Sequence, residues 1–98
     1  MYIEIQMKFI WDEVKNLKNI KKHKVSFVQA AYAFSDPEKK EFYDEKHSAK
    51  EDRYLLFGFA INAVLIISFS EPDTETIRII SARKAKNYEL EAVNYGNG

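Results

Sequence analysis

The chain has 98 residues, of which 46% are hydrophobic and 31% charged, and its 15 basic and 15 acidic side chains leave no formal net charge. This length has room for one hydrophobic core, so we expect a single domain over residues 1–98 with a flexible tail at residues 96–98. The sequence has no cysteine, which excludes disulfides, thiolate catalysis and cysteine-based zinc sites, and its two histidines stand too far apart to suggest a metal centre, so we expect neither a metal nor another cofactor.

The first predicted elements are a strand and a helix. Residues 3–10 largely alternate apolar and polar side chains, which is typical of a strand with one solvated face. Asp12 is placed to cap a helix that runs to about Lys22. The spacing of the apolar residues in this helix predicts that three of them face the core: Val14, Leu17 and Ile20.

A second, short helix follows. Ser26 and Gln29 have the spacing of a capping box, which predicts a helix start at this point. Asp36-Pro37 is a turn signal, and the residue before a proline resists the helical conformation, so the helix should end near Phe34.

The second half of the sequence predicts strands. Residues 41–44 indicate a short strand only weakly, because acidic residues surround them. Residues 53–59 and 63–70 are rich in aromatic and branched side chains and predict a hairpin, with Asn62 supplying the tolerance for turn dihedral angles.

A further strand and a last helix complete the series. Residues 71–73 should turn the chain into a strand over residues 76–81 that places Arg78 on one face with Ile80 and Ala82. Tyr88, Ala92 and Tyr95 have the spacing of one helix face, which predicts a final helix of two or three turns. The order of elements indicates an α+β fold with a small antiparallel sheet, two N-terminal helices and a C-terminal helix.

Charge is distributed in blocks along the chain. Residues 15–24 contain five lysines and no acid, and residues 77–87 contain four basic residues and no acid, whereas residues 36–52 hold seven acids against four lysines. The longest apolar stretch, residues 54–69, is 16 residues long and too short to span a bilayer, and the N-terminus lacks the pattern of a signal peptide. We therefore expect a cytoplasmic protein with no membrane partner.

Motifs for phosphate loops, nucleophile elbows and zinc hydrolases are absent from the sequence. The chemistry-bearing residues that remain are cations and histidines near the ends of predicted elements, and together they could hold phosphates. They are Lys15, Lys18, Lys22, His23, His47, Arg53, Arg78, Arg83 and Lys84.

A set of short motifs resembles one known family. They are Trp11-Asp12-Glu13, Lys15, Asn19, Lys22-His23, Val25-Ser26-Phe27, Asp36-Pro37, Tyr43-Asp44-Glu45, His47-Ser48, Arg53-Tyr54 and the run from Ile77 to Ala85. Over roughly residues 9–95 the chain resembles the BrnT toxin family. The resemblance implies a fold similar to RelE-type ribonuclease toxins, with helices packed on a small antiparallel sheet that meets RNA at its open face.

The resemblance also implies a function. Members inhibit translation by cutting RNA without a metal, and a cognate antitoxin neutralises them. That antitoxin is usually a small DNA-binding protein, so this chain would contact operator DNA only through the antitoxin. The RNA 2′-hydroxyl attacks the adjacent phosphate, which requires a base, cations for the phosphoryl charge and an acid for the leaving oxygen.

The arginines suit the phosphoryl charge because a guanidinium pairs two oxygens and stays charged. We expect Arg53 and Arg78 to stabilise the transition state, and Arg83 and Lys84 to contact phosphates. The alternative is that Arg53 and Arg78 pair with acids across the sheet, namely Glu41, Asp44 or Glu45.

For the base or acid, histidine is the side chain that ordinarily titrates near neutrality. His23 is our catalytic candidate, although it could instead cap the first helix. His47 fits a solvated loop residue better, and Glu51 is a possible base that we rank no higher.

Further RNA contacts are expected from Lys15 and Lys22, and from Trp11 by stacking on a base. A solvated lysine face and a core-packed Trp11 remain the alternatives. Two positions depart from the family pattern, with Lys24 where glycine is common and Lys86 where threonine is common.

Two other functions stay open. The chain could be a catalytically inactive relative that binds a DNA-binding partner and modulates repression. The helix pair over residues 12–34 could also be a helix-turn-helix that enters a DNA groove, for which the lysines are the only support.

Overall fold

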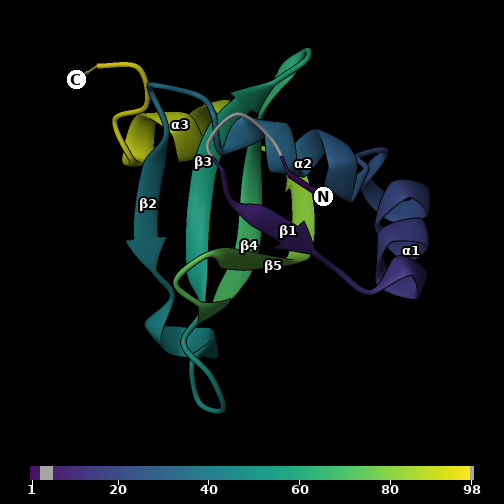
Figure 1. Cartoon of the computed structure of the whole chain (residues 1–98). Helices are drawn as coiled ribbons and strands as arrows, with labels where there is room; N and C mark the ends of the chain where they lie inside the picture. Colours follow the sequence, from purple (N-terminus) through teal and green to yellow (C-terminus); the bar gives the residue numbers. More distant parts are fainter. Residues whose placement is uncertain (3–5, 98) are drawn as a thin grey trace.

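The computed structural model describes residues 1, 2 and 6–97, and it has the predicted α+β architecture. The elements are β1 (Lys8–Ile10), α1 (Glu13–His23), α2 (Phe27–Ala33), β2 (Lys40–Tyr43), a 3-10 helix (Glu45–His47), β3 (Tyr54–Ala60), β4 (Ala63–Asp73), β5 (Thr76–Lys84) and α3 (Asn87–Ala92). The sheet has the order β1-β5-β4-β3-β2, in which β1 runs parallel to β5 and every other pair is antiparallel. Figure 1 shows α2 lying across the strands and α1 set to one side of them.

Both N-terminal helices begin at the predicted caps. Asp12 Oδ1 accepts hydrogen bonds from the backbone N–H groups of Val14 at 2.8 Å and Lys15 at 3.3 Å. Ser26 Oγ accepts one from Gln29 N at 3.0 Å. The first predicted strand is confirmed over residues 8–10, and residues 3–5 of that prediction lie outside the described part of the chain.

The predicted orientation of α1 is wrong. Val14 and Leu17 are each 60% exposed and Ile20 is 37% exposed, whereas Asn16 and Asn19 are buried. The physical reason is that the inner face of α1 meets backbone polar groups and not apolar side chains. Asn19 Nδ2 donates to the carbonyls of Val25 at 2.9 Å and Ala82 at 2.8 Å, and Asn19 Oδ1 accepts from Ala82 N at 3.2 Å.

Asn16 makes a matching contact to the second helix, since its Oδ1 accepts from Phe27 N at 2.8 Å. Buried backbone groups need partners, and the two asparagines supply them. Amide side chains therefore join α1 to α2 and β5.

The predicted hairpin is confirmed as β3 and β4, but its turn differs in detail. Ile61, not Asn62, has the left-handed conformation, with φ of 64°. The predicted turn at residues 71–73 is wrong, because β4 continues to Asp73 and the chain turns at residues 74–75.

The prediction that Arg78 shares one strand face with Ile80 and Ala82 is partly wrong. Phe69 pairs with Ile79 and Ser68 with Ser81, so β5 has one extra residue at this point. Such a bulge shifts the alternation of side chains. Ala82 consequently lies in the core at 1% exposure, on the face opposite Arg78.

The core lies between α2 and one face of the sheet, and it includes Phe9, Phe34 and Phe69. The Phe34 ring packs edge-on against Phe9 at 5.2 Å and against Phe69 at 5.0 Å between centroids. Gly58 lets α2 approach β3 closely, since a Cβ at this position would lie 2.6 Å from Ala33 O. Over the described residues, no helix combines the length and apolar character needed to cross a bilayer.

The last helix is shorter than predicted and turns a different face inward. α3 has six residues, Tyr88 is 66% exposed, and Glu89 and Leu90 are partly buried instead. Beyond the helix, the Tyr95 hydroxyl donates to Asp36 Oδ2, which also accepts from Phe59 N at 2.7 Å. This contact ties the C-terminal segment to the turn between α2 and β2 and to β3.

Candidate functional site

The face of the sheet turned away from the core carries two of the three arginines. Strand register places Arg78 opposite Ser70 and Arg83 opposite Ile66, and Ser68 faces Ser81 between them. Side chains alternate along each strand, and the bulge between Ile79 and Ser81 shifts this alternation by one residue in β5, so these residues all project from the face that α2 leaves uncovered. The bulge therefore brings Arg78 and Arg83 onto one surface, although their spacing of five residues would place them on opposite faces of a regular strand.

Arg53 joins this surface through a loop. Its backbone N–H donates to Ser48 Oγ at 2.9 Å, and Ser48 Oγ donates to Asp44 O at 2.6 Å. These bonds fold residues 44–53 back on themselves and hold Arg53 at the start of β3. The same loop carries Glu51 to the sheet.

Arg53 and Arg78 converge on the carboxylate of Glu51. Arg78 Nη2 donates to Glu51 Oε2, and Arg53 Nε lies 3.8 Å from Glu51 Oε1. Arg78 is the main cause that holds the pKa of Glu51 below its usual value, and the charges of Arg53 and Lys15 act in the same direction. The carboxylate is thus ionised at neutral pH between two guanidinium groups.

The acid that pairs with these arginines differs from those predicted. Glu51 takes the place that Glu41, Asp44 or Glu45 was expected to occupy, and Asp44 instead contacts His47 Nδ1 at 2.8 Å. Arg53 Nε is buried and makes no hydrogen bond within the described part of the chain. One donor of the cluster therefore lacks a hydrogen-bond partner among the described residues, although Glu51 Oε1 lies 3.8 Å from it.

A groove lies along α1, and Arg53, Arg78 and Glu51 are not among the residues that line it. One depression of about 460 Å³ is lined by Lys22, His23, Leu55, Ile66, Ser68, Ser81, Ala82 and Arg83. A second of about 230 Å³ is lined by Lys15, Lys18, Asn19, Lys22, His23, Ile80 and Ser81. The two share Lys22, His23 and Ser81, so they adjoin, and α1 supplies cations to both.

The groove brings together most of the predicted cations. The residues Lys15, Lys22, His23 and Arg83 line it. The charge of Lys15 also helps to lower the pKa of Glu51. Lys84 does not line the groove. It pairs with Leu65 and, as the residue next to Arg83 on the strand, it projects from the opposite face of the sheet.

Arg83 is held by α3. Its two terminal nitrogens donate to the two carboxylate oxygens of Glu89 at 2.8 and 2.6 Å. These hydrogen bonds, together with one from the backbone N–H of Lys86, lower the pKa of Glu89 to about 2. The guanidinium at this end of the groove is therefore fixed in position by a strong ion pair.

Trp11 and His47 also lie outside the groove. The Trp11 ring packs edge-on against Phe27 at 6.2 Å and its Nε1 donates to Glu13 at 3.1 Å. The His47 side chain is 59% exposed in the 3-10 helix. Glu51 pairs with Arg78 only because a loop brings together residues that are 27 positions apart in the sequence, and no local sequence pattern indicates this contact.

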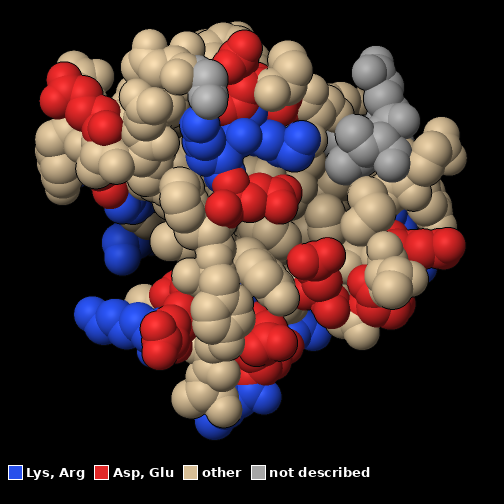
Figure 2. All heavy atoms as spheres, turned by 90° about the vertical axis from the view of Figure 1, so that its left-hand side faces the viewer, with Lys and Arg blue, Asp and Glu red and all other residues tan. Residues whose placement is uncertain are grey.

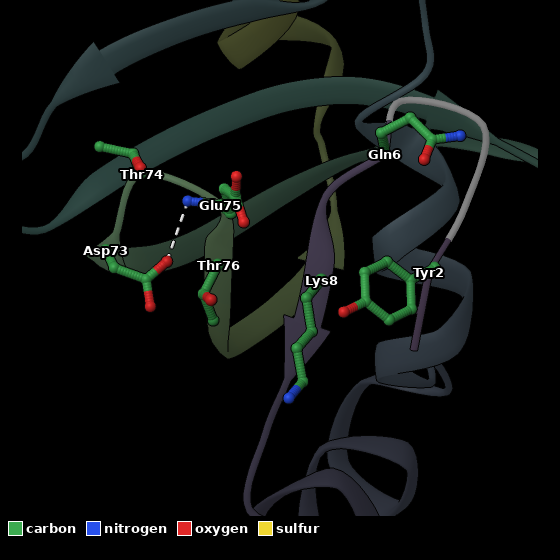
Figure 3. Close-up of a pocket in the computed structure, with 7 residues that line it drawn as sticks. All are labelled: Tyr2, Gln6, Lys8, Asp73, Thr74, Glu75 and Thr76. Carbon is green, nitrogen blue, oxygen red and sulfur yellow. Dashed lines mark hydrogen bonds between the residues drawn. The ribbon is translucent and has the colours of Figure 1, made fainter.

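Other parts of the surface suit an anion less well. Figure 2 shows the side that carries β2, where Asp and Glu side chains lie among uncharged ones and some Lys and Arg side chains. Figure 3 shows a separate depression of about 240 Å³ beside the β4–β5 turn, where the carboxylates of Asp73 and Glu75 stand near Lys8. Two carboxylates with one lysine would repel a phosphate.

Two comparisons with known proteins indicate the same family. Residues 11–89 match the model of the family described as "Ribonuclease toxin, BrnT, of type II toxin-antitoxin system". The structure is similar to the crystal structure of the Brucella abortus ribonuclease toxin BrnT, with a TM-score of 0.64 and 28% sequence identity over 83% of this chain and 99% of that one. A search of curated proteins finds no match. Since the family model covers well over half of the chain, this protein belongs to the BrnT family of ribonuclease toxins of type II toxin–antitoxin systems.

Proposed function

We propose that the groove binds RNA and that Arg53 and Arg78 stabilise the transition state of a metal-independent cleavage. The observation that carries this proposal is the convergence of both guanidinium groups on Glu51. A phosphate presents oxygens with a geometry similar to those of a carboxylate, and arginine pairs with either. A scissile phosphate placed at this point would meet both arginines.

Glu51 is the better-placed general base. It touches Arg78 directly, and Lys15 lies near enough to influence its pKa. His23 stands eight residues further along α1, which corresponds to about 12 Å along the helix axis. We therefore assign proton acceptance to Glu51, and we place His23 with Lys22 and Arg83 as contacts to flanking RNA.

The reaction follows from this placement. The 2′-hydroxyl gives its proton to Glu51 as its oxygen bonds to phosphorus, and the bond from phosphorus to the 5′ oxygen breaks. The leaving 5′ oxygen takes a proton from water, so the products are a 2′,3′-cyclic phosphate and a 5′-hydroxyl. Arg78 is the main cause of the low pKa of Glu51, so transfer of Arg78 to the phosphate would raise that pKa when a base is needed.

In the cell we propose that this cleavage inhibits translation in the cytoplasm. Membership of a type II toxin–antitoxin family implies an antitoxin partner. We further propose that this antitoxin binds DNA, so that the toxin meets operator DNA only through it. The toxin itself would bind RNA as its substrate.

The test is cleavage of a short single-stranded RNA by purified protein in excess chelator. We expect cleavage that disappears when the RNA carries 2′-O-methyl groups, because the nucleophile is then blocked. Arg53→Ala and Glu51→Gln should each lose activity. Arg83→Ala should weaken RNA binding, whereas Lys84→Ala, its neighbour on the opposite face, should not.

A second candidate is a toxin relative that binds its partner without cutting RNA. It is favoured by the carboxylates that already hold Arg78 and Arg83. Intact RNA at high protein concentration, in the presence and absence of divalent metal, together with harmless expression in cells, would support this alternative and contradict the nuclease assignment.

A further inference from the structure

One side of α1 carries three apolar side chains that are exposed to solvent. Val14 and Leu17 are 60% exposed and Ile20 is 37% exposed. Residues three positions apart on a helix are neighbours, so these three form one continuous strip, which we call the α1 stripe. The opposite side of the helix is the one that meets β5 through Asn19, so the stripe is not part of the core.

The stripe also lies outside the RNA groove. The residues of α1 that line the two depressions are Lys15, Lys18, Asn19, Lys22 and His23. None of the three stripe residues lines either depression. A helix that belongs to the groove on one flank therefore presents a separate apolar surface on the other.

The charge around the stripe has one sign. Every charged side chain from residue 14 to residue 24 is a lysine, apart from His23, and Lys18 and Lys21 stand four positions from Val14 and Leu17 respectively. The one acid of the helix, Glu13, is engaged by Trp11 Nε1 at 3.1 Å and Asn16 Nδ2 at 2.9 Å. The surface is thus apolar with a basic border.

We propose that the α1 stripe is the docking surface of the antitoxin and that it takes an amphipathic segment with an apolar face and an acidic border. The proposal uses the antitoxin partner implied by the family and does not depend on RNA cleavage. Apolar anchors would supply affinity, and the basic border would supply specificity and a fast encounter with an acidic partner.

Two other occupants fit less well. A second copy of this chain would bring the lysines of one α1 against those of the other, because a twofold interface repeats the same patch. A lipid surface suits a helix with a broad apolar face, and here three residues of an 11-residue helix form the stripe. The partner that matches both features is an acidic protein segment.

The test is the affinity of the purified antitoxin encoded with this chain for wild-type toxin and for Leu17→Asp, measured by calorimetry. Loss of an interface anchor and gain of a negative charge should weaken binding about 30-fold or more. Ile61→Asp is the matched control, because Ile61 is 73% exposed on the β3–β4 turn, far from α1 in sequence. It should change the affinity by less than about twofold.

Two further measurements separate this proposal from the proposed function. Leu17→Asp should cut RNA like the wild type while resisting inhibition by the antitoxin, and circular dichroism should report an unchanged fold. If the wild type cuts no RNA, the proposed function fails, and the antitoxin affinities of the wild type and Leu17→Asp still test the docking surface by themselves.

The proposal is overturned if the antitoxin fails to bind the wild type or binds Leu17→Asp as tightly as the wild type. It is also overturned if the stripe instead governs binding to vesicles containing anionic phosphatidylserine, or self-association seen by sedimentation. A Lys21→Glu variant should bind the antitoxin more weakly at low salt, with a smaller loss at high salt, since screening removes the attraction in the wild type.

Discussion

Asn19 and Ala82 are joined by two hydrogen bonds that fasten α1 to β5. The amide of Asn19 donates to Ala82 O at 2.8 Å and accepts from Ala82 N at 3.2 Å. The pair fixes the helix that supplies Lys15, Lys22 and His23 against the strand that supplies Arg78 and Arg83. The width of the groove therefore depends on one buried side chain.

Replacing Asn19 should destabilise the protein substantially. Asn19→Ala leaves the backbone groups of Ala82 and Val25 without partners in a buried position, which should cost about 2 kcal/mol in the free energy of unfolding. For a domain of this size the melting temperature should fall by about 10 °C. The exposed Asn87→Ala is the control and should stay within about 0.5 kcal/mol. Equal melting temperatures for the two variants would contradict this role.

Lys24 occupies a backbone conformation that glycine prefers. Its φ of 60° places it in the left-handed region at the end of α1, where a side chain costs about 1 kcal/mol. Lys24→Gly should therefore raise the free energy of unfolding by about that amount, measured by urea denaturation. Lys24→Ala keeps the Cβ and should show no such gain. A loss of stability in the glycine variant would argue against strain at this turn.

The start of α3 lacks a side-chain cap. Lys86 has the extended backbone of a cap residue and its N–H donates to Glu89 Oε1 at 2.9 Å, but its side chain cannot accept from Glu89 N. Lys86→Thr should complete the reciprocal pair and add about 1 kcal/mol of stability. Lys86→Ala supplies no hydroxyl, so a gain of equal size in that variant would refute the capping explanation.

The ion pair of Glu89 with Arg83 should make stability depend on pH in the acid range. The pKa of Glu89 is lowered from its usual 4.5 to about 2 in the folded state. The carboxylate therefore stabilises the fold fully above pH 4.5, and this contribution is lost as pH falls through about 2. Glu89→Gln should melt below the wild type at pH 7, and the gap between the two should narrow from pH 4.5 to pH 2. A constant gap would contradict the assignment.

Local signals in the sequence predicted the helix starts, because Asp12 and Ser26 bond to backbone groups two or three residues away. The orientation of α1 was not predictable in this way. Apolar periodicity assigned Val14 and Leu17 to the core, but the inner face of the helix meets backbone groups from Val25, Phe27 and Ala82, which only the fold brings there.

The candidate site was also predictable from the sequence only in part. Regular alternation along β5 would place Arg78 and Arg83 on opposite faces, because they are five residues apart, so the sequence pattern did not show that they share a surface. The role of Glu51 depends on a loop that packs over Arg78 from 27 residues away. The bulge between Ile79 and Ala82 likewise arises from pairing with β4, and it moved Ala82 to the opposite face.

The most direct test of the account is the rate at which purified protein cuts a single-stranded RNA in excess chelator, compared between the wild type and Arg78→Ala. Removal of a donor to the transition-state charge should slow cleavage about 100-fold or more while the fold, followed by circular dichroism, is retained. Cleavage by Arg78→Ala at the wild-type rate would contradict the account, because the two arginines that meet at Glu51 would then have no part in the reaction.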